Sequence, residues 1–78
     1  MTLIIIELIK NTLLIEDIRP DDDLIEAGYL DSLSIIHLIV NLEQTFGITL
    51  APETLDLDEF RTPKNIQKLV ESHIQNTE

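Results

Sequence analysis

The segment from Ser32 to Phe46 constrains the fold of this chain more than any other feature of its sequence. Its apolar residues recur at three- and four-residue spacing and Gly47 follows as a helix stop, so we expect one α-helix here. At about 100° per residue, one set of apolar side chains falls within a sector of about 100°, as on a helix face packed against a core. This set is Ile35, Leu38, Ile39, Leu42 and Phe46.

The same helix carries a second apolar face. Leu33, Ile36 and Val40 fall roughly opposite the first set, alongside His37 and Gln44. A helix that is apolar on nearly all sides is usually buried, but a chain of 78 residues buries only about 60–65% of its surface on folding. We therefore expect the second face to line an internal pocket or to await a partner.

Three further segments carry helical patterns. One runs from Thr2 to about Leu14, a short one spans Leu57–Arg61, and the last begins at Thr62 and Pro63, a typical N-cap and first helical residue. Their expected core positions are Ile5, Leu8, Ile9, Leu13, Phe60, Ile66, Leu69, Val70 and Ile74. The prediction is an all-α fold, a four-helix bundle of three longer helices and a short third helix, in a single domain over residues 1–78.

Two connections between these helices are long. In residues 15–31, Pro20 stops any helix, three consecutive acids follow it, and a short helical turn is predicted from Asp23 to Ala27. The expected apolar anchors of this connection are Ile18, Leu24, Ile25 and Leu30. Loops longer than about 12–15 residues are usually functional or disordered, and regularly spaced anchors favour the functional kind. The second connection, residues 49–56, contains Pro52.

The charge balance limits the partners of the chain. Because 15 acidic side chains face 5 basic ones, for a net charge of −10, we expect no nucleic acid or membrane partner and expect basic patches on other proteins. The absence of cysteine excludes a disulfide framework and a thiolate metal site, and no metal site is expected. No segment has the pattern of a signal peptide or a membrane span, so a cytoplasmic monomer is the prediction.

Ser32 stands at the predicted start of the 32–46 helix, directly after Asp31. Both residue types are good N-caps, so one of them is expected to cap the helix, and residues 28–33 alone indicate no more than that. A hydroxyl at this place has a further property. Phosphate joined to it would lie beside the free N–H groups at the positive end of the helix dipole.

The wider pattern resembles the acyl, aminoacyl and peptidyl carrier proteins of fatty acid, polyketide and nonribosomal peptide pathways. The resemblance rests on Asp31-Ser32-Leu33 followed by an aliphatic helix that ends in the sequence LEQTFGI, residues 42–48. It continues upstream in residues 23–28 (DLIEAG) and downstream in residues 58–66 (DEFRTPKNI), so it covers nearly the whole chain.

The resemblance implies a free-standing carrier with a specific chemistry. Ser32 would receive 4′-phosphopantetheine from coenzyme A through a phosphopantetheinyl transferase, and the arm would supply the thiol that this chain lacks. An adenylating ligase or an acyltransferase would load an acyl or aminoacyl group as a thioester, and downstream enzymes would receive it. The carrier itself would catalyse nothing. The partner-binding residues would be Asp31, Leu33, Ile36, His37 and Val40.

One branch of the family is favoured. Fatty-acid carriers place several acids along the second helix, whereas Ser34, His37 and Asn41 stand there in this chain and Glu43 is the only acid of the helix. The aliphatic face and residues 60–63 (FRTP) are more similar to the aminoacyl and peptidyl carriers, including the D-alanyl carriers of cell-wall modification.

Two catalytic or metal-binding interpretations fit the sequence less well. A serine hydrolase needs a base near Ser32, but His37 lies about 140° round the same helix, and His73 is expected at the edge of the last helix's apolar stripe. A calcium loop over residues 21–32 lacks the glycine required at its sixth place, where Glu26 stands.

One alternative of another class remains open at this stage. The chain could be an unmodified acidic helical adaptor that binds a partner protein directly through Leu33, Ile36 and Val40. Modification of Ser32 is the observation that separates the carrier from the adaptor.

Overall fold

The computed structural model describes residues 2–51 and 55–76, and this part of the chain is all-helical, as predicted. It contains three α-helices, α1 (Thr2–Leu13), α2 (Ser32–Phe46) and α3 (Pro63–Asn76), and a 3₁₀ turn, η2 (Leu57–Phe60). The expected short third helix is thus a 3₁₀ turn, and Pro52 lies outside the described residues. Within the described ranges, no helix is long and apolar enough to cross a membrane.

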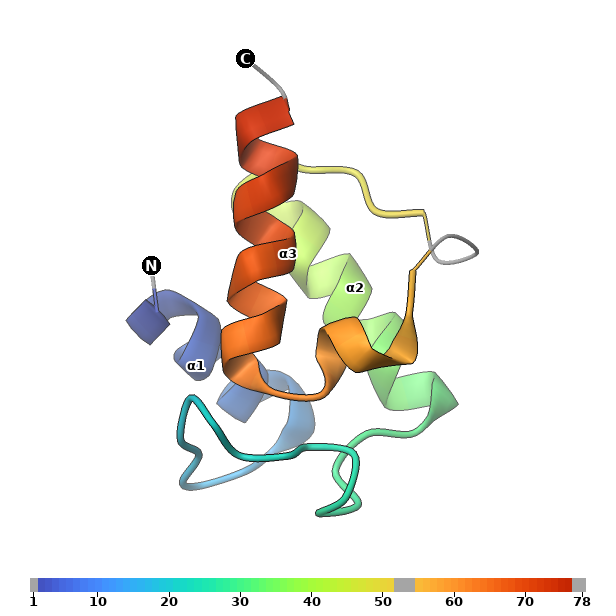
Figure 1. The fold of residues 1–78 in the computed structure, drawn as a ribbon. Helices are drawn as coiled ribbons and strands as arrows, with labels where there is room; N and C mark the ends of the chain where they lie inside the picture. The colour runs from blue at the N-terminus through green and yellow to red at the C-terminus, as the bar shows by residue number, and fades with distance from the viewer. Residues whose placement is uncertain (1, 52–54, 77–78) are drawn as a thin grey trace.

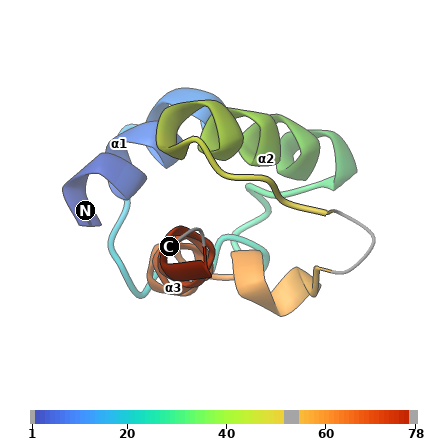
Figure 2. The ribbon, with the colours of Figure 1, turned by 90° about the horizontal axis from the view of Figure 1, so that it is seen from above.

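The helices form two sides around a common core. Seen from above, α1 and α2 lie on one side of the molecule and α3 and η2 on the other (Figure 2). Helix α1 packs against both α2 and α3, and η2 packs against α3 (Figure 1). Long connections link α1 to α2 and α2 to η2.

The core is aliphatic apart from Phe60. Its buried members are Ile5, Ile9, Ile15, Ile18, Leu24, Leu38, Ile39, Leu42, Ile48, Leu50, Phe60, Ile66, Leu69 and Val70. Side chains that are partly buried against it include Leu8, Leu13, Leu30, Ile35, Phe46 and Ile74. The helical spacing therefore predicted the inward faces of all three α-helices. Ile25, an expected anchor, is half-buried but does not belong to this cluster.

The connection from α1 to α2 is tied to the start of α3. The backbone N–H of Leu24 donates to the carbonyl of Arg61 (2.6 Å), and that of Lys64 donates to the carbonyl of Pro20 (3.1 Å). The predicted helical turn forms, since the N–H of Ala27 donates to the carbonyl of Asp23 (3.0 Å). These bonds hold the segment that leads into α2 against the other side of the molecule.

Both α1 and α2 are followed by a residue in the left-handed conformation, but only α2 has a glycine there. Gly47 ends α2 in the left-handed region (φ 64°), as predicted, and its N–H donates to the carbonyl of Glu43 at 2.9 Å. After α1 the left-handed residue is Leu14 (φ 57°), while the N–H of Ile15 donates to the carbonyl of Lys10 at 3.0 Å. A leucine pays a steric penalty at this position that glycine avoids.

Leu14→Gly is therefore expected to stabilise the fold. Leu14 is 89% exposed, so its removal loses little packing. Relief of the left-handed strain exceeds the entropy that glycine adds to the unfolded chain, which predicts a gain of about 0.5–1 kcal/mol in the free energy of unfolding. Urea denaturation followed by circular dichroism measures it. Leu14→Ala keeps the strain and is the matched control, and a glycine variant no more stable than the alanine variant would refute this explanation.

Candidate functional site

Asp31, and not Ser32, caps α2. The backbone of Asp31 is extended (φ −130°, ψ −176°), and its Oδ1 accepts a hydrogen bond from the N–H of Ser34 at 2.8 Å. The first intrahelical bond runs from the N–H of Ile35 to the carbonyl of Asp31 at 2.9 Å. The geometry thus decides which of the two cap candidates is used, and it makes Ser32 the first helical residue.

This division of roles leaves the Ser32 hydroxyl outside the cap. Ser32 is exposed, and the first turn of α2 lies at the end of the molecule opposite the chain's N-terminus (Figure 2). The N–H groups of Ser32, Leu33 and Ser34 have no acceptor within the helix, as at every helix start. An ester of phosphate on this hydroxyl would lie at the positive end of the helix dipole. The place is accessible to another protein and suits an anionic group.

The cap lowers the pKa of Asp31. The largest cause is the hydrogen bond from the backbone N–H of Ser34, which favours the ionised carboxylate, and the side chain of Ser34 adds to it. A carboxyl whose pKa is lower in the folded state contributes stability above its unfolded pKa, about 3.9, and loses that contribution as the pH falls through the folded value.

Asp31→Asn should flatten the acid side of the stability profile. Asparagine is also a good N-cap, so the hydrogen bond is kept while the ionisable charge is lost. We expect the variant to be less stable than the wild type near pH 7 and the difference to vanish well below pH 4. Urea midpoints measured between neutral and acid pH provide the test. A difference that is the same at every pH would show that ionisation of Asp31 does not matter.

The second apolar face of α2 is exposed, which is one of the two arrangements expected from the sequence. Leu33, Ile36 and Val40 are 62%, 53% and 42% exposed, and His37 is exposed beside them. Ile36 also borders a groove between α2 and η2, which is lined by Ile35, Ile36, Ile39, Leu55, Asp56, Leu57 and Phe60. The apolar surface therefore continues from α2 onto η2.

Leu57 is a part of this surface that the sequence did not predict. It is 53% exposed although it lies in η2, two residues after Leu55, which packs against the core. No pattern in the local sequence distinguishes the exposed Leu57 from the packed Leu55.

The polar residues of α2 serve the fold more than its surface. Oε2 of Glu43, the one acid of the helix, accepts the N–H of Leu50 at 2.9 Å and holds the following loop. Asn41, expected on a polar stripe, is half-buried and donates from Nδ2 to Oγ1 of Thr12 at 2.7 Å. The exposed side of α2 is consequently apolar and carries little charge.

The other candidate groups lie in other settings. Nδ1 of His73 is 3.0 Å from the carbonyl oxygen of Leu69, near the end of α3 farthest from the start of α2 (Figure 1). In the acidic segment, Oδ2 of Asp22 accepts the N–H of Arg19 at 2.8 Å, and Oδ1 of Asp23 accepts two backbone N–H groups. Asp22 and Asp23 thus accept hydrogen bonds within turns of the loop.

Comparison with known proteins identifies the class. The family model described as "Phosphopantetheine attachment site" matches residues 4–70. Because the match covers most of the chain, the chain belongs to this family of carrier proteins. The resemblance noted in the sequence is confirmed, and the function is that of a carrier whose phosphopantetheine arm holds an acyl or aminoacyl cargo.

Several similar proteins are D-alanyl carrier proteins. The chain is 41% identical over 68 residues to the D-alanyl carrier protein of Leuconostoc citreum, covering 85% of this chain and 87% of that protein. It is 45% identical over 54 residues to that of Bacillus velezensis (68% and 69%). It is 41% identical over 61 residues to that of Streptococcus pyogenes (76% and 77%). Carriers of an amino acid are thus among its similar proteins.

Proposed function

We propose that Ser32 is the attachment point of the phosphopantetheine arm and that the chain is a D-alanyl carrier. The observation that carries the proposal is the exposed Ser32 hydroxyl at the start of α2, left out of the cap by Asp31. When attached, the arm supplies the thiol on which cargo is held as a thioester, a group that this cysteine-free chain lacks. The similarity to D-alanyl carriers supports the choice of cargo.

Each part of the chain has a role in this function. Ser32 provides the oxygen of the phosphoester, Asp31 fixes the first turn of α2, and the apolar face docks partner enzymes. A carboxylic acid must be activated before it forms a thioester, so the partners are a phosphopantetheinyl transferase, an adenylating ligase and a downstream aminoacyl-transferring enzyme. The carrier presents the cargo and catalyses no step. In this proposal residues 1–78 form one four-helix carrier domain, with η2 as its third element.

The apolar face of α2 is the proposed docking surface. Leu33, Ile36 and Val40 lie on one face of α2, near its start, and form an exposed apolar patch. Leu33 directly follows Ser32, so a partner that reaches the hydroxyl comes close to this side chain. Asp31 and His37 border the same face and add its polar contacts.

Leu33→Asp and Ile36→Asp are expected to impair arm attachment and cargo loading without unfolding the protein. Each variant places a charge where the partner buries apolar surface, which predicts a loss of roughly tenfold or more in kcat/KM for the transferase. Transferase kinetics and the circular dichroism of the same samples provide the measurement.

Leu3→Asp is the matched control for these variants. Leu3 is 77% exposed on α1, at the opposite end of the molecule from the start of α2 (Figures 1 and 2). It should be loaded at the wild-type rate. If Leu3→Asp slowed loading as much as Leu33→Asp, the effect would come from added charge alone and the docking surface would be wrong.

The cargo is tested on protein recovered from its native host. Hydroxylamine cleaves thioesters, so the intact mass of the protein before and after treatment gives the mass of the group on the arm. Chiral chromatography of the released compound gives its configuration. The hydroxamate of D-alanine is the expected product. A fatty acyl group, or another amino acid, would contradict the proposed cargo while leaving the carrier class in place.

A further inference from the structure

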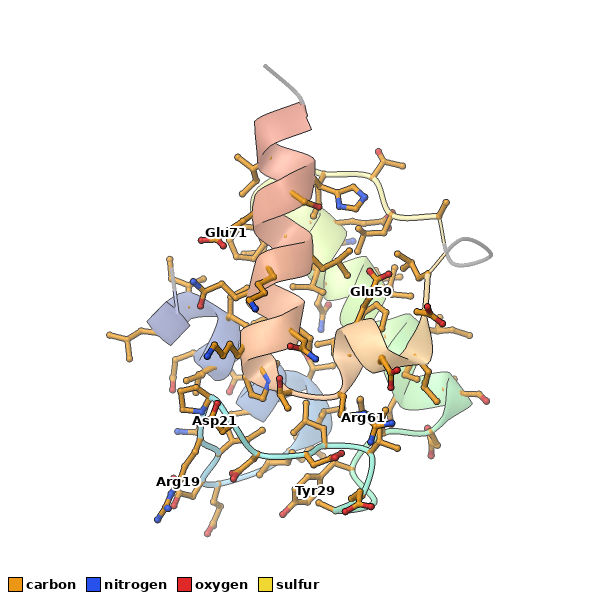
Figure 3. All side chains as sticks on the ribbon, in the orientation of Figure 1. Arg19, Asp21, Tyr29, Glu59, Arg61 and Glu71 are labelled. Carbon is orange, nitrogen blue, oxygen red and sulfur yellow. The ribbon has the colours of Figure 1, made fainter. Side chains whose placement is uncertain are left out.

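Arg61 joins two segments that are far apart in the sequence. Its Nη1 lies 3.1 Å from Oδ2 of Asp23 in the loop before α2, while Nε and Nη2 lie 3.0 Å and 2.9 Å from Oδ1 of Asp58 in η2. Figure 3 shows the Arg61 side chain between η2 and the loop that continues to Tyr29. The backbone carbonyl of Arg61 also accepts the N–H of Leu24 at 2.6 Å.

The two ion pairs of Arg61, with Asp23 and with Asp58, differ in their surroundings. The side chains of Arg61 and Asp23 are 38% and 32% exposed, whereas that of Asp58 is 76% exposed. The Asp58 contact spans three residues within one local segment, but the Asp23 contact spans 38 residues and crosses between segments. Of the two ion pairs, only the one with Asp23 therefore restrains the loop, and it is also the less hydrated.

Asp23 also fixes the turn that leads into α2. Its Oδ1 accepts the N–H groups of Ile25 (3.1 Å) and Glu26 (2.9 Å), and so fixes the turn over residues 24–28. The N–H of Tyr29 then donates to the carbonyl of Leu24 at 3.0 Å, which closes the turn two residues before the capping Asp31. One oxygen of Asp23 thus organises the turn while the other is held by Arg61.

The electrostatics agree with this geometry. The hydrogen bond from the N–H of Glu26 is the largest cause that lowers the pKa of Asp23, and the contacts with Arg61 lower it further. The hydrogen bonds that Arg61 donates to the carboxylates of Asp58 and Asp23 raise the pKa of Arg61. Both groups are fully ionised at neutral pH, where the enzymes that modify a carrier operate.

We propose that Arg61 is a positioning residue for the modification of Ser32, acting through Asp23 to hold the loop that presents the start of α2. The inference rests on the proposed role of Ser32. Without the Arg61 contact, the loop samples several arrangements and a transferase must select the competent one. Its apparent affinity is then reduced by the competent fraction, so KM for the carrier rises while kcat stays close to the wild-type value.

Two substitutions isolate the contact between the segments. Asp23→Asn keeps an oxygen that caps the turn but removes the charge and the acceptor facing Arg61, and Arg61→Gln removes the cation. Asp58→Asn is the matched control, since it weakens only the local ion pair between Arg61 and Asp58. All variants are first shown to be folded by circular dichroism at the assay temperature, and kcat and KM of arm attachment are then measured with coenzyme A and one transferase.

The expected result is a rise of roughly two- to fivefold in KM for Asp23→Asn and for Arg61→Gln, which is about what a partly exposed ion pair contributes to the population of the competent loop. The double variant should be no worse than either single one, because both remove the same contact. Arg61→Lys, which keeps a cation able to reach Asp23, should recover most of the loss. Asp58→Asn should match the wild type.

Two results would overturn the inference, and they differ from a failure of the proposed function. Folded Asp23→Asn and Arg61→Gln variants with wild-type KM would show that the contact does not position Ser32. An equal loss in Asp58→Asn would assign the effect to η2 and not to the loop. If the wild-type protein itself takes up no arm, the proposed role of Ser32 fails, and with it the inference.

Discussion

Replacing Ser32 by alanine is expected to abolish attachment of the phosphopantetheine arm completely. The substitution removes the oxygen that forms the phosphoester and nothing that the fold uses, because Asp31 provides the cap and alanine is well suited to a helix. The apo-protein is incubated with coenzyme A and a broad-specificity phosphopantetheinyl transferase, and its intact mass is recorded. The wild type should gain one arm and Ser32→Ala none.

Ser34→Ala is the control that makes this result specific. Ser34 lies in the same first turn of α2, so its substitution tests whether the Ser34 hydroxyl is needed for attachment. We expect the variant to gain one arm, as the wild type does. If Ser32→Ala is still modified, the attachment point is another residue. If no version is modified while a known carrier is, the unmodified adaptor becomes the better interpretation.

Phe60→Ala is expected to cause the largest loss of stability of any single substitution considered. Phe60 is 2% exposed in the core, where η2 packs against α3. Truncation of a buried phenylalanine to alanine costs about 3–5 kcal/mol, and the whole fold of a chain this short is worth about 4–12 kcal/mol. Urea denaturation should show a free energy of unfolding that is lower than that of the wild type by about 3–5 kcal/mol.

Leu57→Ala provides the contrast within the same 3₁₀ turn. Leu57 is 53% exposed, so its truncation leaves no cavity and should cost less than about 1 kcal/mol. The comparison separates the inward side of η2 from the side that faces a partner. Equal losses at the two positions would mean that Leu57 belongs to the core and that the apolar surface does not extend onto η2.

Helical spacing and the glycine at position 47 were enough to predict the extent of α2 and its buried face. The end of α1 was less well defined because Leu14 takes the left-handed conformation that usually calls for glycine or asparagine. Arg61 and Leu57 show a different limit of the sequence. Their roles depend on contacts between segments that are distant in the chain, and no local pattern encodes these.

At the candidate site, the sequence indicated the right residues but left their roles open. Asp31 and Ser32 are equally good caps by type, and only the extended backbone of Asp31 and its bond to the N–H of Ser34 separate them. The exposure of Leu33, Ile36 and Val40 was one of the two arrangements expected, since a short chain cannot bury both faces of α2.

The most direct test is to locate the arm on the modified wild-type protein. Proteolysis followed by tandem mass spectrometry of the peptide that contains both Ser32 and Ser34 assigns the added mass to one side chain. The account predicts that all of the phosphopantetheine is on Ser32. An arm found on Ser34 or on any other residue would contradict it, because the exposed hydroxyl beside the Asp31 cap would then not be the group that partner enzymes use.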